Sequence, residues 1–200
     1  QSTINLQGSA FIAGYTAVNK LYGLLECSAI ALGASFTTFG SQNFGAGKYD
    51  RVGLGVRHGG MIATNTSAVI TLILMFFSPV LFGFFTDTPE LIDLATRMIR
   101  IMAVGYICIS VTQVLGGVMR GSGDTVTPMW ITMVTTILLR IPVAYGLAYL
   151  TRTPEFPNGQ PHALFISLLI SWSMGALISY IVFRRGKWRR KALEVIGMEH

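Results

Sequence analysis

Three long stretches of this sequence, at 58–86, 101–119 and 156–183, contain no aspartate, glutamate, lysine or arginine. A helix needs about 20 apolar residues to cross the hydrocarbon of a bilayer, and its backbone amides must find their partners within the segment. Charged residues make up only 12% of the 200 residues, whereas a soluble domain carries about 25%. The sequence therefore predicts an all-α membrane protein.

Two further stretches are long enough to cross a membrane but contain charges. Lys20 and Glu26 interrupt the first, and Arg140 interrupts the second. With them, we predict five transmembrane helices in one polytopic bundle that occupies residues 1–200. The predicted spans are about 9–40, 59–85, 98–119, 126–150 and 162–183, followed by a basic tail at 184–200.

The basic residues predict the orientation of the chain, because lysine and arginine accumulate on the cytoplasmic side of a membrane. Only three fall on one side of the predicted spans: Arg97, Arg100 and Arg152. Ten fall on the other side: Lys48, Arg51, Arg57, Arg120, Arg184, Arg185, Lys187, Arg189, Arg190 and Lys191. We therefore expect the carboxyl end in the cytoplasm and the amino end outside. The cluster at 184–191 is expected to stop the transfer of the chain across the membrane and to anchor the chain to anionic lipid.

Charged side chains within a span are costly and point to function. In the first span Asn19, Tyr22 and Glu26 fall along one helical stripe, and Lys20 lies on the neighbouring stripe. Lys20 and Glu26 are separated by about 9 Å along the axis and roughly 120° around it, so they are not expected to pair. Lys20 either reaches the outer interface or shares a cavity with Glu26. Glu26 either is protonated and bonded to a backbone carbonyl, or binds a proton, cation or cationic substrate.

Small residues recur four positions apart, a spacing that lets helices approach closely in lipid. The pattern joins Ala29 to Gly33 in the first span and Gly117 to Gly121 in the third. We expect both pairs to serve helix packing. The chain also begins at Gln1, close to an apolar segment, and we expect it to be part of a longer protein.

No motif for catalysis, metal binding or nucleotide binding is recognisable. A phosphate-binding loop that ends at Lys48 would need glycine at Gln42, and a dinucleotide motif that begins at Gly121 would need glycine at Val126. The three histidines and two cysteines are isolated, so neither a metal site nor a disulfide is expected. We therefore predict no enzyme, no nucleic-acid partner, no bound metal and no cofactor.

Three segments in order resemble the multidrug and toxic compound extrusion (MATE) family. They are Gly40–Arg51, Met119–Thr125 with Pro128, and Leu139–Tyr145. The resemblance covers nearly the whole chain. It implies a protein of twelve helices in two lobes of six, in which these five spans are the eighth to the twelfth helices. The partner of this part would then be the amino-terminal lobe of the same polypeptide.

The resemblance implies a secondary active antiporter in a bacterial cell membrane. Such a protein exports organic cations or drugs in exchange for Na⁺ or H⁺ by alternating access. Two alternatives stay open. One is a flippase for a lipid-linked saccharide, which would need a broad cationic cavity, and the other is a non-transporting membrane scaffold or sensor lobe.

Several family members carry an acidic residue in the tenth helix, about one turn before a glutamine that matches Gln113. Ser110 or its neighbours take that place here, which favours Glu26 as the group that couples transport to an ion. The candidate residues of the cavity are Glu26, Lys20, Asn19, Tyr22 and Gln113.

Two further sets of residues receive predicted roles. Arg140 and Pro142 match a family pattern, and we expect a structural role because Arg140 can bond carbonyls freed by a kink at Pro142. The polar, glycine-rich turns on the cytoplasmic side are predicted hinges. Their candidate residues are Gln42, Asn43, Gly45, Gly47, Arg120, Gly121 and Gly123.

Overall fold

The computed structural model describes residues 9–84, 87–152, 162–186 and 188–190. Within these ranges the chain is helical and contains no strand, which confirms the predicted all-α class. Five segments are long and apolar enough to cross a membrane, as predicted. The elements are α2 (Ser9–Gly45), α3 (Tyr49–Gly83), α4 (Pro89–Gly121), α5 (Val126–Met133), the π-helical segment η1 (Val134–Leu139), α6 (Arg140–Leu150) and α7 (His162–Arg184). The elements α5, η1 and α6 follow one another directly and form one span.

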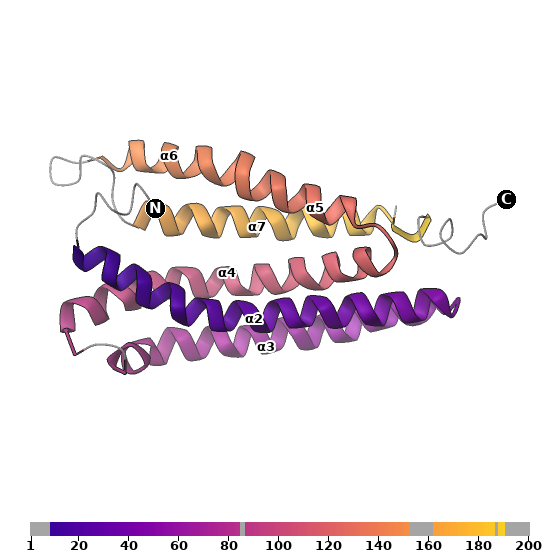
Figure 1. Cartoon of the computed structure of the whole chain (residues 1–200), viewed down its shortest axis with the longest axis horizontal. Helices are drawn as coiled ribbons and strands as arrows, with labels where there is room; N and C mark the ends of the chain where they lie inside the picture. Colours follow the sequence, from indigo (N-terminus) through magenta and orange to yellow (C-terminus); the bar gives the residue numbers. More distant parts are fainter. Residues whose placement is uncertain (1–8, 85–86, 153–161, 187, 191–200) are drawn as a thin grey trace.

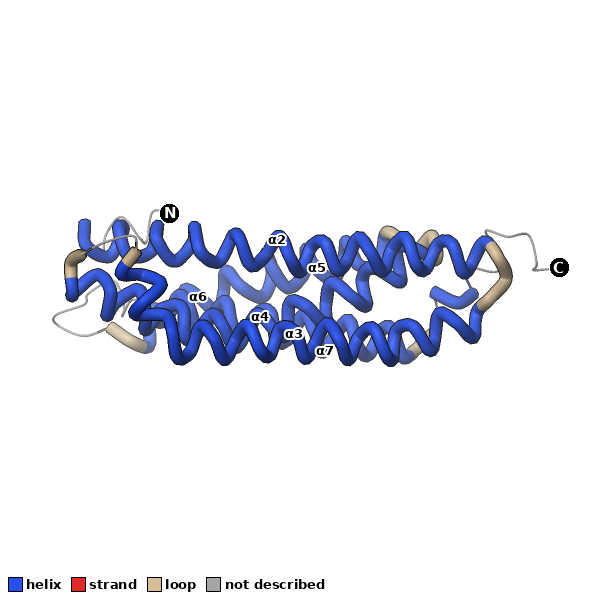
Figure 2. The backbone as a smooth tube through the Cα atoms, turned by 90° about the horizontal axis from the view of Figure 1, so that it is seen from below, coloured by secondary structure: helices blue, strands red, loops and turns tan. Residues whose placement is uncertain are grey.

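The bundle is built around α4. This helix packs along α2 and α3 on one side and along α7 on the other, and α6 packs mainly on α7. Figure 1 shows this layered order, and Figure 2 shows the long, narrow bundle from below with its turns at the two ends. In the apolar 18-residue stretch that identifies α4 as a membrane span, 56% is buried inside the bundle, compared with 11% to 33% for the corresponding stretches of the other spans. Large apolar side chains such as Phe76 of α3 and Leu138 of η1 are instead exposed, as expected for surfaces that face lipid.

Glycines bring α2 and α4 into backbone contact. A Cβ atom at Gly117 would clash with the carbonyl oxygen of Gly33 on α2. A Cβ at Gly121 would lie 2.6 Å from the carbonyl oxygen of Thr37 and 3.0 Å from the amide nitrogen of Ser41. Because backbone atoms cannot turn aside as a flexible side chain can, these positions require glycine. The predicted packing role is confirmed for Gly33, Gly117 and Gly121.

The turn between α2 and α3 closes the end of α2 with two backbone hydrogen bonds. Lys48 N–H donates to the Asn43 carbonyl at 2.8 Å, and Gly47 N–H donates to the Phe44 carbonyl at 2.9 Å. This is the Schellman arrangement, in which the residue after the helix adopts a left-handed conformation. Gly47 has that conformation, with φ of 69°.

The turn after α4 repeats this geometry. Asp124 N–H donates to the Met119 carbonyl and Gly123 N–H donates to the Arg120 carbonyl, both at 3.0 Å. Gly123 is left-handed, with φ of 88°.

The two turns are shorter than the sequence predicts. The helices α2 and α4 continue to Gly45 and Gly121, because the capping bonds hold the last helical turn closed. The candidate turn residues that are helical are Gln42, Asn43, Gly45, Arg120 and Gly121. Only Gly47 and Gly123 of that set lie in the turns themselves, which corrects the prediction.

A proline inside α3 is compensated by a neighbouring helix. Pro79 has no N–H to donate to the carbonyl four residues earlier, that of Met75. Arg100 of α4 donates its Nε–H to this carbonyl at 3.1 Å. In lipid an unpaired carbonyl is costly, so Arg100 stabilises the packing of α3 against α4.

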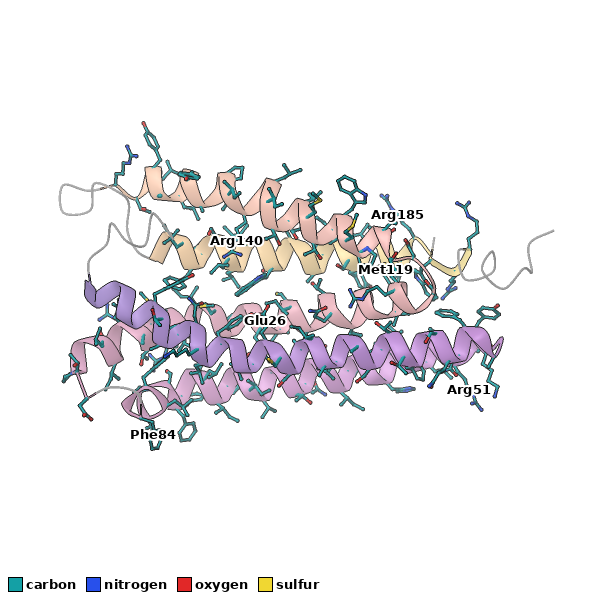
Figure 3. The ribbon with its side chains drawn as sticks, in the orientation of Figure 1. Glu26, Arg51, Phe84, Met119, Arg140 and Arg185 are labelled. Atoms are coloured by element: carbon teal, nitrogen blue, oxygen red, sulfur yellow. The ribbon has the colours of Figure 1, made fainter. Side chains whose placement is uncertain are left out.

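Most basic residues gather at one end of the bundle, which we call the basic end. Its described members are Lys48, Arg51, Arg57, Arg120, Arg184, Arg185, Arg189 and Arg190. Figure 3 shows Arg51 and Arg185 toward this end and Phe84 at the opposite end. At the opposite end Arg97 pairs with Asp93 at 2.7 Å. The cytoplasmic location of the basic end stays a prediction, and Lys187, Lys191 and the rest of the tail to residue 200 lie outside the described residues.

The backbone contact predicts a large difference between two glycine-to-alanine substitutions. Gly117→Ala places a methyl group against the backbone of α2 and should lower the free energy of unfolding by about 1–3 kcal/mol. Gly23→Ala is the matched control, because a Cβ there meets no atom within 4 Å. That change should be neutral or stabilising by up to about 1 kcal/mol. Thermal unfolding of both variants in detergent measures the difference, and equal melting temperatures would contradict the required contact.

Candidate functional site

A cavity of about 370 Å³ opens at membrane depth between four spans of the bundle. Its walls come from α2, from α4, from α7 and from the span formed by α5, η1 and α6. Figure 3 shows Glu26 of α2 and Arg140 of α6 at similar positions along the bundle, on opposite sides of the space between these helices. The lining residues are Tyr15, Asn19, Tyr22, Glu26, Met102, Ile109, Thr112, Gln113, Thr132, Thr135, Thr136, Arg140, Leu168, Ser171, Trp172 and Gly175.

The structure brings together four of the five residues predicted for a cavity. Asn19, Tyr22 and Glu26 follow one another along the same face of α2, and Gln113 reaches the same space from α4. The helical stripe in the sequence is therefore the wall of the cavity. Lys20 does not belong to the lining, because it lies about 100° around the helix from Asn19.

Tyr22 presents both a flat ring and an unused hydroxyl group. Its ring stacks on Trp172 of α7, with centroids 5.3 Å apart and an angle of 7° between the planes. The side chain is only 6% exposed, and its Oη atom has no hydrogen-bond partner among the described residues. A buried hydroxyl without a partner is costly, so this group is available to a bound water, ion or ligand.

Three threonine hydroxyl groups of the cavity are turned toward the backbone. Thr112 donates to the Cys108 carbonyl at 3.0 Å, and Thr132 donates to the Pro128 carbonyl at 3.0 Å. Thr135 donates to the Ile131 carbonyl at 2.8 Å. The hydrogen atoms of these three hydroxyls are therefore used within the protein, which leaves the Tyr22 hydroxyl, the amides and the charged groups as the main polar sites for a ligand.

The charged groups of the cavity are Glu26 and Arg140. Across the described ranges neither side chain forms an ion pair or hydrogen bond. Both charges therefore depend on water or on a ligand, because an uncompensated charge in a membrane span is costly. The cavity therefore offers a cation the negative carboxylate of Glu26, and the positive guanidinium of Arg140 lines the same cavity.

Arg140 is not placed as its predicted structural role implies. Its side chain lines the cavity, and no hydrogen bond from it to a backbone carbonyl is found among the described residues. The hydroxyl of Ser171 on α7 donates to the Thr135 carbonyl of η1 at 2.7 Å, and this carbonyl also accepts the backbone N–H of Arg140. The π-helical segment ends just before Arg140 and so coincides with the bend expected near Pro142.

Sequence reasoning missed the cavity positions of Arg140, Trp172 and Ser171. Arg140 carried a usable signal, since an arginine within a span points to function for the same reason as Glu26. Trp172 and Ser171 carried none, because aromatic and hydroxyl residues are common within spans and their roles depend on which helix lies opposite.

Two residues, Ile109 and Ser110, lie about one turn before Gln113, and their side chains point to different faces of α4. Ser110 is fully buried and faces α3, where its hydroxyl lies 2.5 Å from that of Ser67. Ile109 lines the cavity instead. An acidic residue is therefore absent from this part of the cavity wall, and Glu26 is the acidic residue that lines it within the described part of the chain.

Cysteine labelling should separate these two faces of α4. In a protein whose Cys27 and Cys108 are replaced by serine, Gln113→Cys should react with a water-soluble thiol reagent, because position 113 lines the cavity. Ser110→Cys should react at least tenfold more slowly, because position 110 is enclosed between α3 and α4. Mass spectrometry of the labelled protein measures both rates, and equal rates would show that the cavity is misassigned.

The family described as MatE matches residues 2–146. The crystal structure of the eukaryotic MATE transporter AtDTX14 has a TM-score of 0.77 and covers 94% of this chain and 40% of that chain, at 20% sequence identity. The two chains therefore share a fold.

Curated relatives match over most of this chain but over a minor part of their own length. The probable multidrug resistance protein YoeA of Bacillus subtilis is 27% identical over 171 residues, which is 84% of this chain and 37% of the relative. The probable multidrug resistance protein NorM of Thermotoga maritima is 22% identical over 94% of this chain and 39% of its own. This chain therefore spans about two fifths of the length of such relatives. It belongs to the MatE family.

Proposed function

We propose that this chain forms the carboxyl-terminal lobe portion of a multidrug antiporter that exports organic cations or drugs in exchange for Na⁺ or H⁺. One observation carries the proposal: an unpaired carboxylate, Glu26, lines a polar cavity at membrane depth in a member of the MatE family. The names of the relatives, which include probable multidrug resistance proteins and a MATE transporter, support transport rather than catalysis.

Glu26 is the group that would bind the transported cation or the coupling ion. Oxygen atoms of Asn19, Tyr22 and Gln113 line the same cavity, and hard cations such as Na⁺ prefer oxygen ligands, as Ca²⁺ and Mg²⁺ do. An organic cation would gain the same carboxylate and could also stack on the Tyr22 and Trp172 rings through a cation–π contact.

Competition for one carboxylate would produce exchange. Arg140 balances the charge of Glu26, so the cavity is close to neutral when empty and positive when it holds one cation. A second cation in the same cavity would be repelled, because charges interact strongly in a site of low dielectric constant. Substrate and coupling ion would therefore occupy the lobe in turn, as alternating access requires.

The proposal predicts different effects for two substitutions on α2. In the complete transporter, Glu26→Gln removes the negative charge and should reduce ethidium efflux driven by an imposed Na⁺ or H⁺ gradient by at least tenfold. Lys20→Gln removes a charge from the same helix outside the cavity, and efflux should stay within about twofold of the unaltered rate, as is usual for exposed positions. Efflux from proteoliposomes with matched amounts of inserted protein measures both.

The same assay distinguishes the coupling ion and the alternatives. Loss of efflux in Glu26→Gln under only one of the two gradients identifies the ion that Glu26 binds. Normal efflux in Glu26→Gln would remove this residue from the mechanism, and no gradient-driven efflux in the unaltered protein would favour a scaffold or sensor. A flippase is less favoured, because Arg140 is the basic residue of the cavity among the described positions.

We further propose that the left-handed turns at Gly47 and Gly123 are hinges for the movement of the lobe. Gly47→Asn should keep most of the efflux rate, because asparagine tolerates a positive φ. Gly47→Val should slow efflux several-fold, because a β-branched residue is strained at φ of 69°. Rates are normalised to folded protein, and an unchanged rate in Gly47→Val would exclude a hinge at this turn.

A further inference from the structure

A second groove lies at the basic end, on the face of α4 opposite the cavity. It has a volume of about 390 Å³ and is formed by α3, α4, α7 and the short helical turn at 188–190. On α4 the cavity uses Ile109, Thr112 and Gln113, whereas the groove uses Val111, Val114 and Leu115. These two sets point in opposite directions around a helix of 3.6 residues per turn.

The floor of the groove is apolar, and missing side chains create its depth. A Cβ at Gly53 would meet no atom within 4 Å, and a Cβ at Gly60 would meet its nearest atom, on Val114, at 3.9 Å. Val111, Val114 and Phe183 supply apolar walls. The stretch from Arg57 to Thr64 extends about 10 Å along α3, which is long enough to accept part of an acyl chain.

The rim of the groove carries three arginines: Arg57, Arg184 and Arg189. No carboxylate pairs with any of them within the described ranges. An adjoining hollow of about 570 Å³ shares Gly53, Trp188 and Arg189 with the groove and adds one acidic residue, Asp50. The charge of the groove is therefore positive, and its guanidinium groups are free to bind an anion.

Aromatic side chains position two of these arginines. The Arg184 guanidinium lies 5.9 Å from the centre of the Tyr180 ring, and that of Arg189 lies 5.1 Å from the Trp188 ring. Trp188 is itself fixed, since it is 3% exposed, stacks on Phe183 at 4.9 Å and donates its Nε1–H to the Phe183 carbonyl at 2.9 Å. The cationic rim is thus built on a packed aromatic cluster.

We propose that this groove binds one anionic phospholipid. The phosphate contacts Arg57, Arg184 and Arg189, and one acyl chain lies in the hollow left by Gly53 and Gly60. Basic pockets between transmembrane helices are suited to such headgroups. A free phosphate ion would leave the apolar floor empty, and a zwitterionic lipid would bring a positive group to a rim that is already positive.

The test uses the complete transporter, stripped of lipid in detergent. Phosphatidylglycerol or phosphatidylcholine with the same acyl chains is added, and native mass spectrometry measures the lipid that remains bound. Phosphatidylglycerol should bind more tightly and should raise the melting temperature more than phosphatidylcholine does. Soluble glycerophosphoglycerol should give no comparable stabilisation. Equal binding of the two lipids, or equal stabilisation by the soluble headgroup, would overturn the proposal.

Substitutions separate this groove from general attraction to the basic end. The triple substitution of Arg57, Arg184 and Arg189 by glutamine should weaken phosphatidylglycerol binding strongly, at about fivefold for each basic residue. The control, Arg51→Gln with Arg185→Gln, removes charges at the same end outside the groove and should keep most of the binding. Gly53→Leu keeps every arginine and fills the hollow, so it should also weaken binding if an acyl chain lies there. Retained preference for phosphatidylglycerol in the triple variant would overturn the site. If the triple variant folds poorly, unweakened binding of phosphatidylglycerol to Gly53→Leu would overturn it.

Discussion

The contact between the backbones of α2 and α4 determines where the rest of the bundle can lie. Lipid gives helices no hydrophobic reason to associate, so their contact depends on close packing. Gly33, Gly117 and Gly121 allow that packing near the basic end. With α2 fixed on one side, α4 also packs against α3 and α7, and it becomes the most buried span.

The same contact explains where the cavity opens. At Gly33 the helices touch, and the position that a Cβ there would occupy lies 3.2 Å from the Gln113 side chain. Beyond that point along α2, the residues that line the cavity are Glu26, Tyr22 and Asn19, whose side chains are too large for backbone contact. One face of α2 thus changes from a packing surface to a cavity wall, and Gln113 stands at the boundary between them.

The sequence predicted the helices and the wall of this cavity that α2 supplies. Long apolar runs define spans without reference to their neighbours, and a polar stripe on α2 is visible from helical periodicity alone. The side that α4, η1 and α7 contribute depends on tertiary packing. Ser110 and Ile109 are adjacent in sequence, yet one bonds to Ser67 of α3 and the other lines the cavity. The ends of α2 and α4 were predicted too early, because polar glycine-rich sequence also occurs in a last helical turn that capping bonds keep closed.

Interrupted helices show how the bundle divides its polar residues between structure and function. Pro79 frees the Met75 carbonyl of α3, and Arg100 of α4 binds it. In η1 the Thr135 carbonyl accepts hydrogen bonds from the Ser171 hydroxyl and from the backbone of Arg140. The hydroxyl of Ser171 thereby ties α7 to the π-helical segment. The same segment ends just before Arg140, whose side chain lines the cavity with Glu26, so the interruption of the helix lies directly beside the positive charge that faces the carboxylate across the cavity.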